Sequence, residues 1–358
     1  MGVLVIAEAG VNHNGDEALA FELVNKAAEA GADIVKFQTF KASKLVTHSA
    51  EQCAYQISNT KKKESQFDML RRLELSYEAH FRLLEHCRCL GIEFLSTAFD
   101  LDSLSFLVAE LGLSRLKIPS GEITNAPLIL AYARSNCDLL ISTGMATLAE
   151  VEFALGVIAF GFVSSDTCEP TLEAFQEAYT SKTGQRLLKE KVVILHCTTE
   201  YPAPIEDINL RAMDTLSSAF GMKVGYSDHS EGLNVPIAAV ARGATVIEKH
   251  FTLDRGMIGP DHKASIEPDE LKSMVRDIRS IELALGDGIK GPRLSEIENK
   301  KVARKSLVAI SKIAEGEEFS ISNVGVKRPG TGVSPTRYWE YLGQSSSRTY
   351  AEGDLIID

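Results

Sequence analysis

The sequence predicts an α/β fold: a barrel of eight parallel strands that alternate with helices, followed by a small β-rich domain. Two observations predict it. Eight short apolar runs alternate with longer segments whose apolar residues recur at helical spacing, as in a parallel barrel. This alternation stops near residue 286, where a polar stretch leads into short strands and turns. An open doubly wound sheet is the alternative, and the count of eight strands favours the (β/α)8 or TIM barrel.

All eight predicted strands lie within the first 285 residues. They are VLVIAE (3–8), IVKF (34–37), EFLS (93–96), LKI (116–118), LLIS (139–142), VVIL (192–195), KVGY (223–226) and TVIEK (245–249). The segments between them are amphipathic, as in EALAFELVNKAAEAG, where Gly31 ends the helix just before the next strand. Two connections are longer than a barrel needs. They are 47–75, a polar insert after the second strand, and 163–190, a surface excursion before the sixth.

The predicted domains are a barrel over 1–285, a linker over 286–303 and a small domain over 304–358. The stretch GDGIKGPRLSEIENKK is polar, with three glycines and one proline, which is typical of a linker. The small domain is near the lower size limit for independent folding, so we expect it to dock on another surface. Trp339 and Tyr341 are expected in its core.

Composition and charge exclude several classes of function. The chain has 358 residues, of which 44% are hydrophobic and 24% charged, as in a soluble globular protein. A net charge of −11 argues against nucleic-acid partners, yet leaves room for a small anionic substrate. No apolar run is long enough for a membrane span, and the N-terminus lacks the basic flank of a signal peptide. Six cysteines without a CxxC pair indicate reduced thiols, so a cytoplasmic protein is expected.

Polar and ionisable residues follow the predicted strands, at the end where barrel enzymes carry their chemistry. They are Glu8, Lys36, Gln38, Thr97, Lys117, Ser120, Glu122, Ser142, His196, Tyr201, Ser227, Asp228, His229, Glu248, Lys249 and His250. Lysines flanked by apolar residues are unusual there, because a buried lysine needs a partner or loses its charge. Two of these lysines and three hydroxyls could bracket a phosphate or a carboxylate, although each serine alone could serve a turn or a helix cap. These candidates are Lys36, Lys117, Ser120, Ser142 and Ser227.

A divalent metal ion could lie between the seventh and eighth strands. His229 and His250 follow these strands, which are neighbours in a barrel, so their imidazoles could meet over one ion. Asp261 in the eighth loop could join or orient them, and His262 is the alternative ligand. Two histidines, a carboxylate and water suit an ion such as Mn or Zn and leave positions open for a substrate. Packed core histidines are the competing interpretation.

Taken together, motifs along nearly the whole chain resemble the sialic acid synthase family. They are AEAGVNHNGD, VKFQTFKA, KIPSGE, STGMAT, HCTTEYPAP, GYSDHS, EKHFTLD, GPDH and KRPGTG. The resemblance implies a TIM barrel with a C-terminal antifreeze-like (SAF, β-clip) domain, and a swapped homodimer whose tail reaches the partner's site. It also implies condensation of phosphoenolpyruvate with N-acetylmannosamine and water to give N-acetylneuraminate and phosphate, dependent on Mn²⁺ or Mg²⁺.

The resemblance further implies roles for individual residues. The metal ligands would be His229 and His250, and the catalytic residues Glu8, Glu122 and Lys117, with Glu122 a candidate for proton transfer. Phosphoenolpyruvate would be held by Lys36, Thr97, Lys117, Ser120, Ser142 and Ser227. The sugar would be contacted by Glu8, Gln38, Tyr201 and Asp261, and by Arg328 from the partner chain. Thr199 stands where some relatives carry a phosphate-contacting asparagine, a departure that leaves its role open.

Three alternatives remain. Within the family, the sugar could be 2,4-diacetamido-2,4,6-trideoxymannose, giving N,N'-diacetyllegionaminate, because the motifs contact parts that both sugars share. A Schiff-base aldolase with Lys117 or Lys36 as its nucleophile would also carry a lysine at a strand end. An ice-binding tail would need a flat apolar face on residues 301–358. The charged KRPG motif argues against that, and the strand-end lysines and histidines would then have no purpose.

Overall fold

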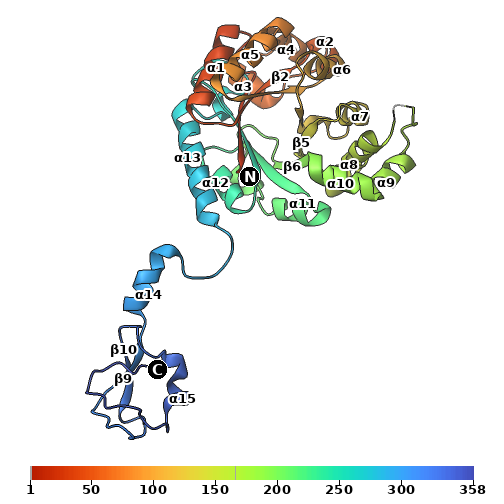
Figure 1. Ribbon diagram of the computed structural model, residues 1–358. Coiled ribbons are helices and arrows are strands. Elements are labelled where there is room, and N and C mark those ends of the chain that lie inside the picture. The colour runs from red at the N-terminus through yellow and green to blue at the C-terminus, as the bar shows by residue number, and fades with distance from the viewer. Residues whose placement is uncertain (1, 166) are drawn as a thin grey trace. The chain divides into compact units, whose positions relative to one another are not determined.

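The computed structural model describes residues 2–165 and 167–358 (Figure 1). The contacts within the chain divide it into two compact units, Met1–Gly286 and Asp287–Asp358. In the first unit, the helices surround a central sheet (Figure 1). Among the described residues, no helix combines the length and the apolar character that crossing a membrane requires.

The sheet of the first unit has eight strands in the order β3-β2-β1-β8-β7-β6-β5-β4. They are β1 (Leu4–Gly10), β2 (Ile34–Thr39), β3 (Glu93–Ala98), β4 (Arg115–Ile118), β5 (Asp138–Ser142), β6 (Val192–Cys197), β7 (Lys223–Asp228) and β8 (Val246–His250). All its pairings are parallel, and β1 pairs with both β2 and β8, which joins the first strand to the last. Because β3 and β4 also contact each other, the barrel is nearly closed, and the predicted (β/α)8 fold is confirmed.

Helices connect these strands at the predicted places. They are α1 (Glu17–Glu29), α2 (Ala42–Leu45), α3 (Ala54–Thr60), α4 (Gln66–Leu73), α5 (Tyr77–Leu90), α6 (Leu101–Ser105), α7 (Ala126–Arg134), α8 (Leu148–Val163), α9 (Leu172–Thr180), α10 (Lys182–Lys191), α11 (Ala212–Phe220), α12 (Asn234–Ala241) and α13 (Pro268–Leu285). Short helical turns are η1 (Phe106–Glu110), η2 (Ser120–Glu122), η3 (Ile205–Asp207) and η4 (His262–Ala264). Local sequence sets their ends: Asp16 caps α1 by accepting from the backbone N–H of Ala18, and Gly31 follows its end at φ +82°.

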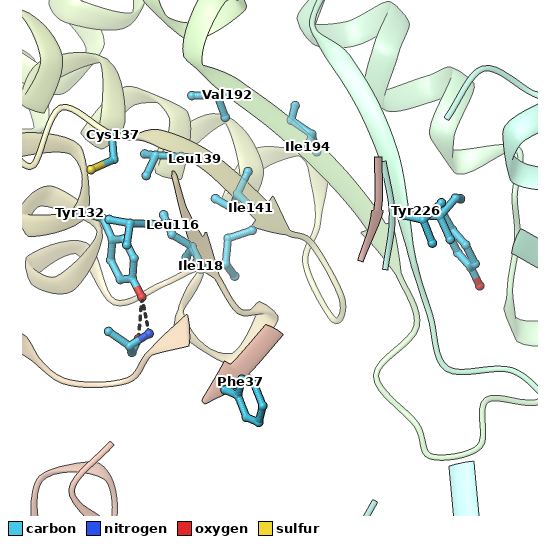
Figure 2. Close-up of a cluster of buried hydrophobic side chains, with 14 of the residues drawn as sticks. Phe37, Leu116, Ile118, Tyr132, Cys137, Leu139, Ile141, Val192, Ile194 and Tyr226 are labelled. Atoms are coloured by element: carbon cyan, nitrogen blue, oxygen red, sulfur yellow. Dashed lines mark hydrogen bonds between the residues drawn. The ribbon is translucent and has the colours of Figure 1, made fainter. Parts of the chain in front are cut away.

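The apolar core of the barrel has two layers. The inner layer consists of Ile6, Ile34, Leu95, Leu140, Leu195 and Val246, each from a strand. The outer layer lies between strands and helices, and Figure 2 shows side chains of β4, β5 and β6 near Tyr132 of α7. The buried Tyr132 hydroxyl donates to the carbonyl of Ala98 at 2.6 Å and accepts from its N–H at 3.0 Å. This outer layer fixes the strands whose ends carry the candidate site.

The two long connections contain helices. The segment 163–190 carries α9 and α10, which pack on α8. The segment 47–75 carries α3 and α4, and Asn59 of α3 donates to the carbonyl of Pro260 at 2.7 Å. This hydrogen bond ties the insert to the loop after β8.

The second unit is small and β-rich, as predicted. It contains η5 (Leu294–Glu296), α14 (Ile297–Ala303), β9 (Ser306–Ala309), β10 (Val324–Lys327), η6 (Pro335–Arg337) and α15 (Tyr338–Tyr341), with β9 and β10 antiparallel. Part of the predicted linker is therefore helix α14. Tyr341 lies in the apolar core of this unit, but the prediction for Trp339 is wrong, because its side chain is 78% exposed. In the single turn of α15, Tyr338 and Tyr341 share the inner face, and position 339 points elsewhere.

Candidate active site

A cavity of about 240 Å³ lies at the C-terminal ends of the barrel strands, and all eight strands or the residues directly after them contribute to its lining. The structure brings together there most of the predicted site residues. They are Glu8, Lys36, Gln38, Thr97, Lys117, Ser120, Ser142, Thr199, Tyr201, Ser227, His229, His250 and Asp261. This is the end of the barrel where (β/α)8 enzymes place their chemistry.

The alternation of side chains along the strands explains this convergence. Successive residues of a strand point to opposite faces, so residues two apart share a face. Each apolar residue of the inner layer is followed, two positions later, by a residue that lines the cavity. The pairs are Ile6 and Glu8, Ile34 and Lys36, Leu95 and Thr97, Leu140 and Ser142, Leu195 and Cys197, and Val246 and Glu248. The barrel interior is thus apolar at one end and charged at the other.

Two lysines and two glutamates form the charged floor of the cavity, and none is more than 4% exposed. Lys36 Nζ lies 2.9 Å from Glu8 Oε2 and 3.0 Å from Glu248 Oε2, and it donates to Thr97 Oγ1 at 3.3 Å. These contacts surround the Lys36 ammonium with two carboxylates and a hydroxyl. Lys117 Nζ is held more loosely, with Glu248 Oε1 at 3.6 Å and its own neighbour's carbonyl at 3.4 Å. Lys117 therefore has donors left for a ligand.

Burial and pairing shift the pKa values of this cluster in different directions. Burial raises the pKa of Glu8 to about 7, and Lys36 opposes the rise only in part. Burial would also raise the pKa of Glu248, but Lys117 and Lys36 outweigh it and lower that pKa. Burial lowers the pKa of Lys117, whereas Glu248 and Glu8 overcome burial at Lys36 and raise its pKa. One carboxyl of the cluster can thus exchange a proton near neutral pH.

Glu248 lines the cavity, although the sequence predicts no role for it beyond its place at a strand end. It pairs with both lysines of the floor and accepts from Ser227 Oγ at 2.8 Å. Its position two residues after the buried Val246 is the signal that could have assigned it to the barrel interior.

The two histidines meet at the cavity, with ring centroids 5.4 Å apart. The Nδ1–H of His229 donates to the carbonyl of Thr198 at 2.7 Å, which leaves Nε2 free to bind. In the described part of the chain, the buried Nδ1 of His250 has no hydrogen-bond partner. Burial lowers the pKa of His229 to about 4 and that of His250 well below its usual value. Neutral imidazoles with available nitrogens fit a divalent metal ion.

Within the ranges 2–165 and 167–358, the two histidines stand as a pair without a third side chain of the usual ligand types grouped with them. Among the described residues, no group of three or more His, Cys, Asp or Glu side chains could hold a metal ion. His262 is not an alternative ligand, because Thr252 Oγ1 bonds its Nδ1 at 2.6 Å and Asn14 Oδ1 bonds its Nε2 at 3.2 Å. Asp261 lines the cavity, and burial raises its pKa to about 6. A metal ion held here would take its other ligands from substrate or water.

Hydroxyl and backbone donors gather beside Lys117. Ser120 Oγ accepts from the backbone N–H of Gly144 at 2.9 Å. A Cβ at Gly144 would collide with Thr199 Oγ1, so this close approach requires glycine. The buried Ser142 Oγ finds no hydrogen-bond partner within the residues that the structure describes. Unpaired buried polar atoms are rare, and here they mark a place where a polar ligand fits.

An aromatic stack lies against His229, with Tyr201 from the loop after β6 and Tyr55 from the insert. Tyr201 lies against His229, with ring centroids 4.2 Å apart, and Tyr55 of α3 stacks on Tyr201 at 5.2 Å. Tyr55 is not among the predicted site residues. It lies in the insert 47–75, whose sequence indicates only a polar surface. An aromatic residue in a long loop beside a barrel strand end is the one signal that could have found it.

Some predicted residues lie elsewhere. Of the described residues, those that line the cavity do not include Glu122, which lies in η2 and accepts from Asn125 Nδ2 at 2.7 Å. Arg328 belongs to the second unit, where its Nε donates to the carbonyl of Ala303 at 3.0 Å. Lys249 and Asp228 form a fully buried ion pair on the opposite side of their strands from the cavity-lining residues. That lysine therefore serves packing, and it is no part of the charged floor.

Residues 23–290 match the family model described as NeuB family. A Campylobacter jejuni protein named N,N'-diacetyllegionaminic acid synthase is 48% identical over 99% of this chain and 98% of its own length. A Legionella pneumophila protein of the same name is 44% identical over 100% of this chain and 94% of its own. Among solved structures, the N-acetylneuraminic acid (sialic acid) synthetase of Leptospira borgpetersenii is 32% identical, with a TM-score of 0.66. That match covers 84% of this chain and 90% of the other.

Proposed function

The chain belongs to the NeuB family of synthases, and we propose that it makes N,N'-diacetyllegionaminic acid. In this reaction phosphoenolpyruvate condenses with 2,4-diacetamido-2,4,6-trideoxymannose and water, and phosphate leaves. The family resemblance implies N-acetylmannosamine as the sugar, with the trideoxy sugar as the alternative. The names of the two bacterial relatives favour the trideoxy sugar instead.

One observation carries the proposal: a single cavity joins an anion-binding end to a pair of neutral histidines. Lys117, Ser120 and Ser142 form the first, and they suit the phosphate and carboxylate of phosphoenolpyruvate. His229 and His250 form the second, 5.4 Å apart by ring centroid. An enzyme that joins an anionic enol to a neutral sugar aldehyde needs both.

His229 and His250 would hold the divalent ion, Mn²⁺ or Mg²⁺, which would polarise the aldehyde oxygen of the open-chain sugar as a Lewis acid. Phosphoenolpyruvate on Lys117 and Ser142 presents its C3 to the aldehyde carbon, and the new C–C bond forms there. Water adds at C2, and Glu8 accepts its proton, because a pKa of about 7 suits a general base. The bond between C2 and the phosphate oxygen then breaks, the C2 hydroxyl becomes the ketone, and its proton goes to the former aldehyde oxygen. Lys117 and Lys36 stabilise the leaving phosphate.

This scheme assigns the proton to Glu8 instead of Glu122. Glu8 lines the cavity and contacts Lys36, whereas Glu122 is engaged with Asn125 outside the lining. Replacing Glu122 by Gln should leave turnover near the native value, and Glu8→Gln should lower it by about 10²–10⁴. Equal losses in both variants would contradict the assignment.

Phosphate release from phosphoenolpyruvate tests the function directly. The protein is stripped of metal, Mn²⁺ is added back, and the trideoxy sugar is compared with N-acetylmannosamine in parallel. We expect metal-dependent release, faster with the trideoxy sugar. Release with N-acetylmannosamine alone would make the chain an N-acetylneuraminate synthase, and metal-independent release would reject the role of the histidine pair.

A Schiff-base aldolase is the second candidate, because burial lowers the pKa of Lys117 and so favours a nucleophilic amine. Borohydride reduction in the presence of a ketoacid discriminates between the two. Mass gain on Lys117 would support the aldolase. We expect no adduct, and phosphate release in its place.

We also propose, from the family resemblance, that the protein works as a swapped homodimer in which Arg328 contacts the partner's sugar. Mixing an Arg328→Ala chain with a His250→Ala chain tests this. Partial recovery of activity is expected, because mixed dimers would contain one intact site. Absence of recovery, with dimers shown by light scattering, would count against the swap.

A further inference from the structure

One part of the cavity lining takes no part in the chemistry described above. It consists of five apolar side chains, here called the apolar wall: Val11, Met69, Leu70, Leu73 and Phe99. They come from the loop after β1, from α4 and from the residue after β3. All five belong to an apolar cluster separate from both layers of the barrel core, which Phe40 and Leu45 complete. Three of the five side chains therefore come from the insert, and the other two come from residues that follow barrel strands.

The wall provides few hydrogen-bond partners for a polar group, because its side chains carry no nitrogen or oxygen. The thioether of Met69 is already a partner of Gln52 Nε2, at 3.2 Å. Gln56 lines the cavity nearby in sequence, but its side-chain oxygen accepts from the backbone N–H of Cys53 at 2.9 Å. A hydroxyl placed against this wall would lose its hydrogen bonds to water without replacement.

The wall adjoins the predicted sugar contacts. Val11 lies three residues after Glu8, and Gln38 Nε2 donates to Glu8 Oε1 at 3.3 Å. The loop that carries Asp261 is tied to the insert by the hydrogen bond from Asn59 to Pro260. In an open-chain hexose, C1 and C6 are opposite ends. With C1 at the two histidines, C6 would lie at the part of the cavity away from them.

We propose that the apolar wall binds the C6 methyl group of the sugar and so selects a 6-deoxy sugar over one with a C6 hydroxyl. This inference rests on the proposed function. Transfer of a methyl group from water to an apolar surface is favourable in free energy, and the methyl group needs no hydrogen-bond partner there. The C4 acetamide fits the wall less well, because its N–H and C=O both need hydrogen bonds. Selection against an added hydroxyl in an apolar pocket amounts to about tenfold to a hundredfold.

The test uses two sugars that differ only at O6: N-acetylmannosamine and 2-acetamido-2,6-dideoxymannose. Phosphate release gives kcat/KM for each, and their ratio is the readout. In the native protein we expect the 6-deoxy sugar to be preferred about tenfold or more. Leu70→Asn should bring the ratio to within about threefold of unity, because the new amide offers a partner to O6 of N-acetylmannosamine and takes an apolar contact from the methyl group of the 6-deoxy sugar.

A matched control exists in the same cluster. Leu45 packs against the same buried residues, but among the described residues it is not part of the cavity lining. Leu45→Asn therefore makes the same chemical change without reaching the sugar, and it should keep the native ratio within about twofold. If Leu70→Asn loses its folded circular dichroism spectrum, Val11→Thr replaces it, since it adds one hydroxyl to the wall at nearly constant shape.

Two results would overturn the inference and leave the proposed function standing. One is equal kcat/KM for the two sugars in the native protein, with normal release from the trideoxy sugar. The other is an unchanged ratio in Leu70→Asn and Val11→Thr. Absence of release with every sugar, metal present, would reject the proposed function itself and the inference with it.

Discussion

The protein buries lysines on the two opposite faces of its barrel strands, and the two environments differ. On the outer face, Lys249 pairs with Asp228 and donates to the carbonyl of Ser230 at 2.7 Å, while Asp228 accepts from the N–H and the hydroxyl of Ser230. On the inner face, Lys117 keeps donors to spare, and Ser142 Oγ has no partner among the described residues. The outer pair is closed, in that its charged groups have protein partners, and the inner cluster is open, in that some of its polar groups remain available to a ligand. Unused donors on a buried lysine, as on Lys117, thus indicate a ligand site, whereas a lysine whose partners are all protein groups, as in Lys249, does not by itself indicate one.

The largest expected effect is a loss of folding stability when the outer pair of Lys249 and Asp228 is broken. Lys249→Met leaves Asp228 buried without its cation, so we expect the free energy of unfolding to fall by about 3–5 kcal/mol. Urea denaturation followed by circular dichroism measures it. Adding Asp228→Asn to Lys249→Met should recover part of the loss, because the amide can still accept from Ser230. A loss below about 1 kcal/mol in Lys249→Met would show that the outer pair is not the closed structural unit that its contacts indicate.

The inner cluster should respond in the opposite way. Lys117→Met removes a donor that serves the substrate, so kcat should fall by about 10²–10³, while the thermal midpoint stays close to native. Glu248 keeps Lys36 and Ser227 as partners in this variant, and no charge is left without a partner. Lys182→Met, an exposed lysine, is the control for loss of one positive charge. A large drop in the thermal midpoint with unchanged kcat would make Lys117 a structural residue.

The contrast also predicts pH dependence at the inner cluster. Glu8 has a pKa of about 7 in the folded state, above its ordinary value of 4.5, so the folded state holds the proton more tightly. Its contribution to stability is therefore present at low pH and is lost as the pH rises from about 4.5 to about 7. Activity should move the other way, because a general base must be unprotonated. Stability and kcat/KM measured from pH 5 to 8 check both, and Glu8→Gln should reduce both slopes, leaving in the stability profile the share of Asp261, whose pKa burial raises to about 6. If stability and kcat/KM both rose or both fell with pH in this window, the role of Glu8 as the general base would be contradicted.

The barrel could be predicted from the sequence because its strands are buried on both faces and read as short apolar runs. Part of the site could be predicted for a related reason: on six strands a cavity residue stands two positions after a buried apolar residue, as in Ile34 and Lys36. Glu122 shows where such reasoning stops. It lies beyond the strand, where the turn η2 sets the direction of each side chain, and Gly121 lines the cavity while Glu122 does not.

The insert could not be predicted from its own residues. Its sequence indicates polar surface, yet α3 and α4 supply Tyr55 and most of the apolar wall. Their place depends on a hydrogen bond from Asn59 to Pro260, two residues 201 positions apart in the chain. Contacts of this kind leave no periodic signal. Residues that a barrel strand carries are therefore predictable, and residues that a docked loop carries are not.

The smallest expected effect tests whether the insert contributes to binding of the sugar. Tyr55→Ala removes the stack on Tyr201, which is worth about 0.5–1.5 kcal/mol, so KM for the sugar should rise about twofold to tenfold with kcat nearly unchanged. Tyr77→Ala is the matched control, because Tyr77 stacks on Phe106 at 3.8 Å away from the cavity lining. That variant should lower the thermal midpoint and leave KM as it is. Equal KM values in the two variants would mean that the stack against His229 only packs the insert. A change in KM for Tyr55→Ala alone would make the insert a working wall of the site, held there by contacts that the strands do not provide.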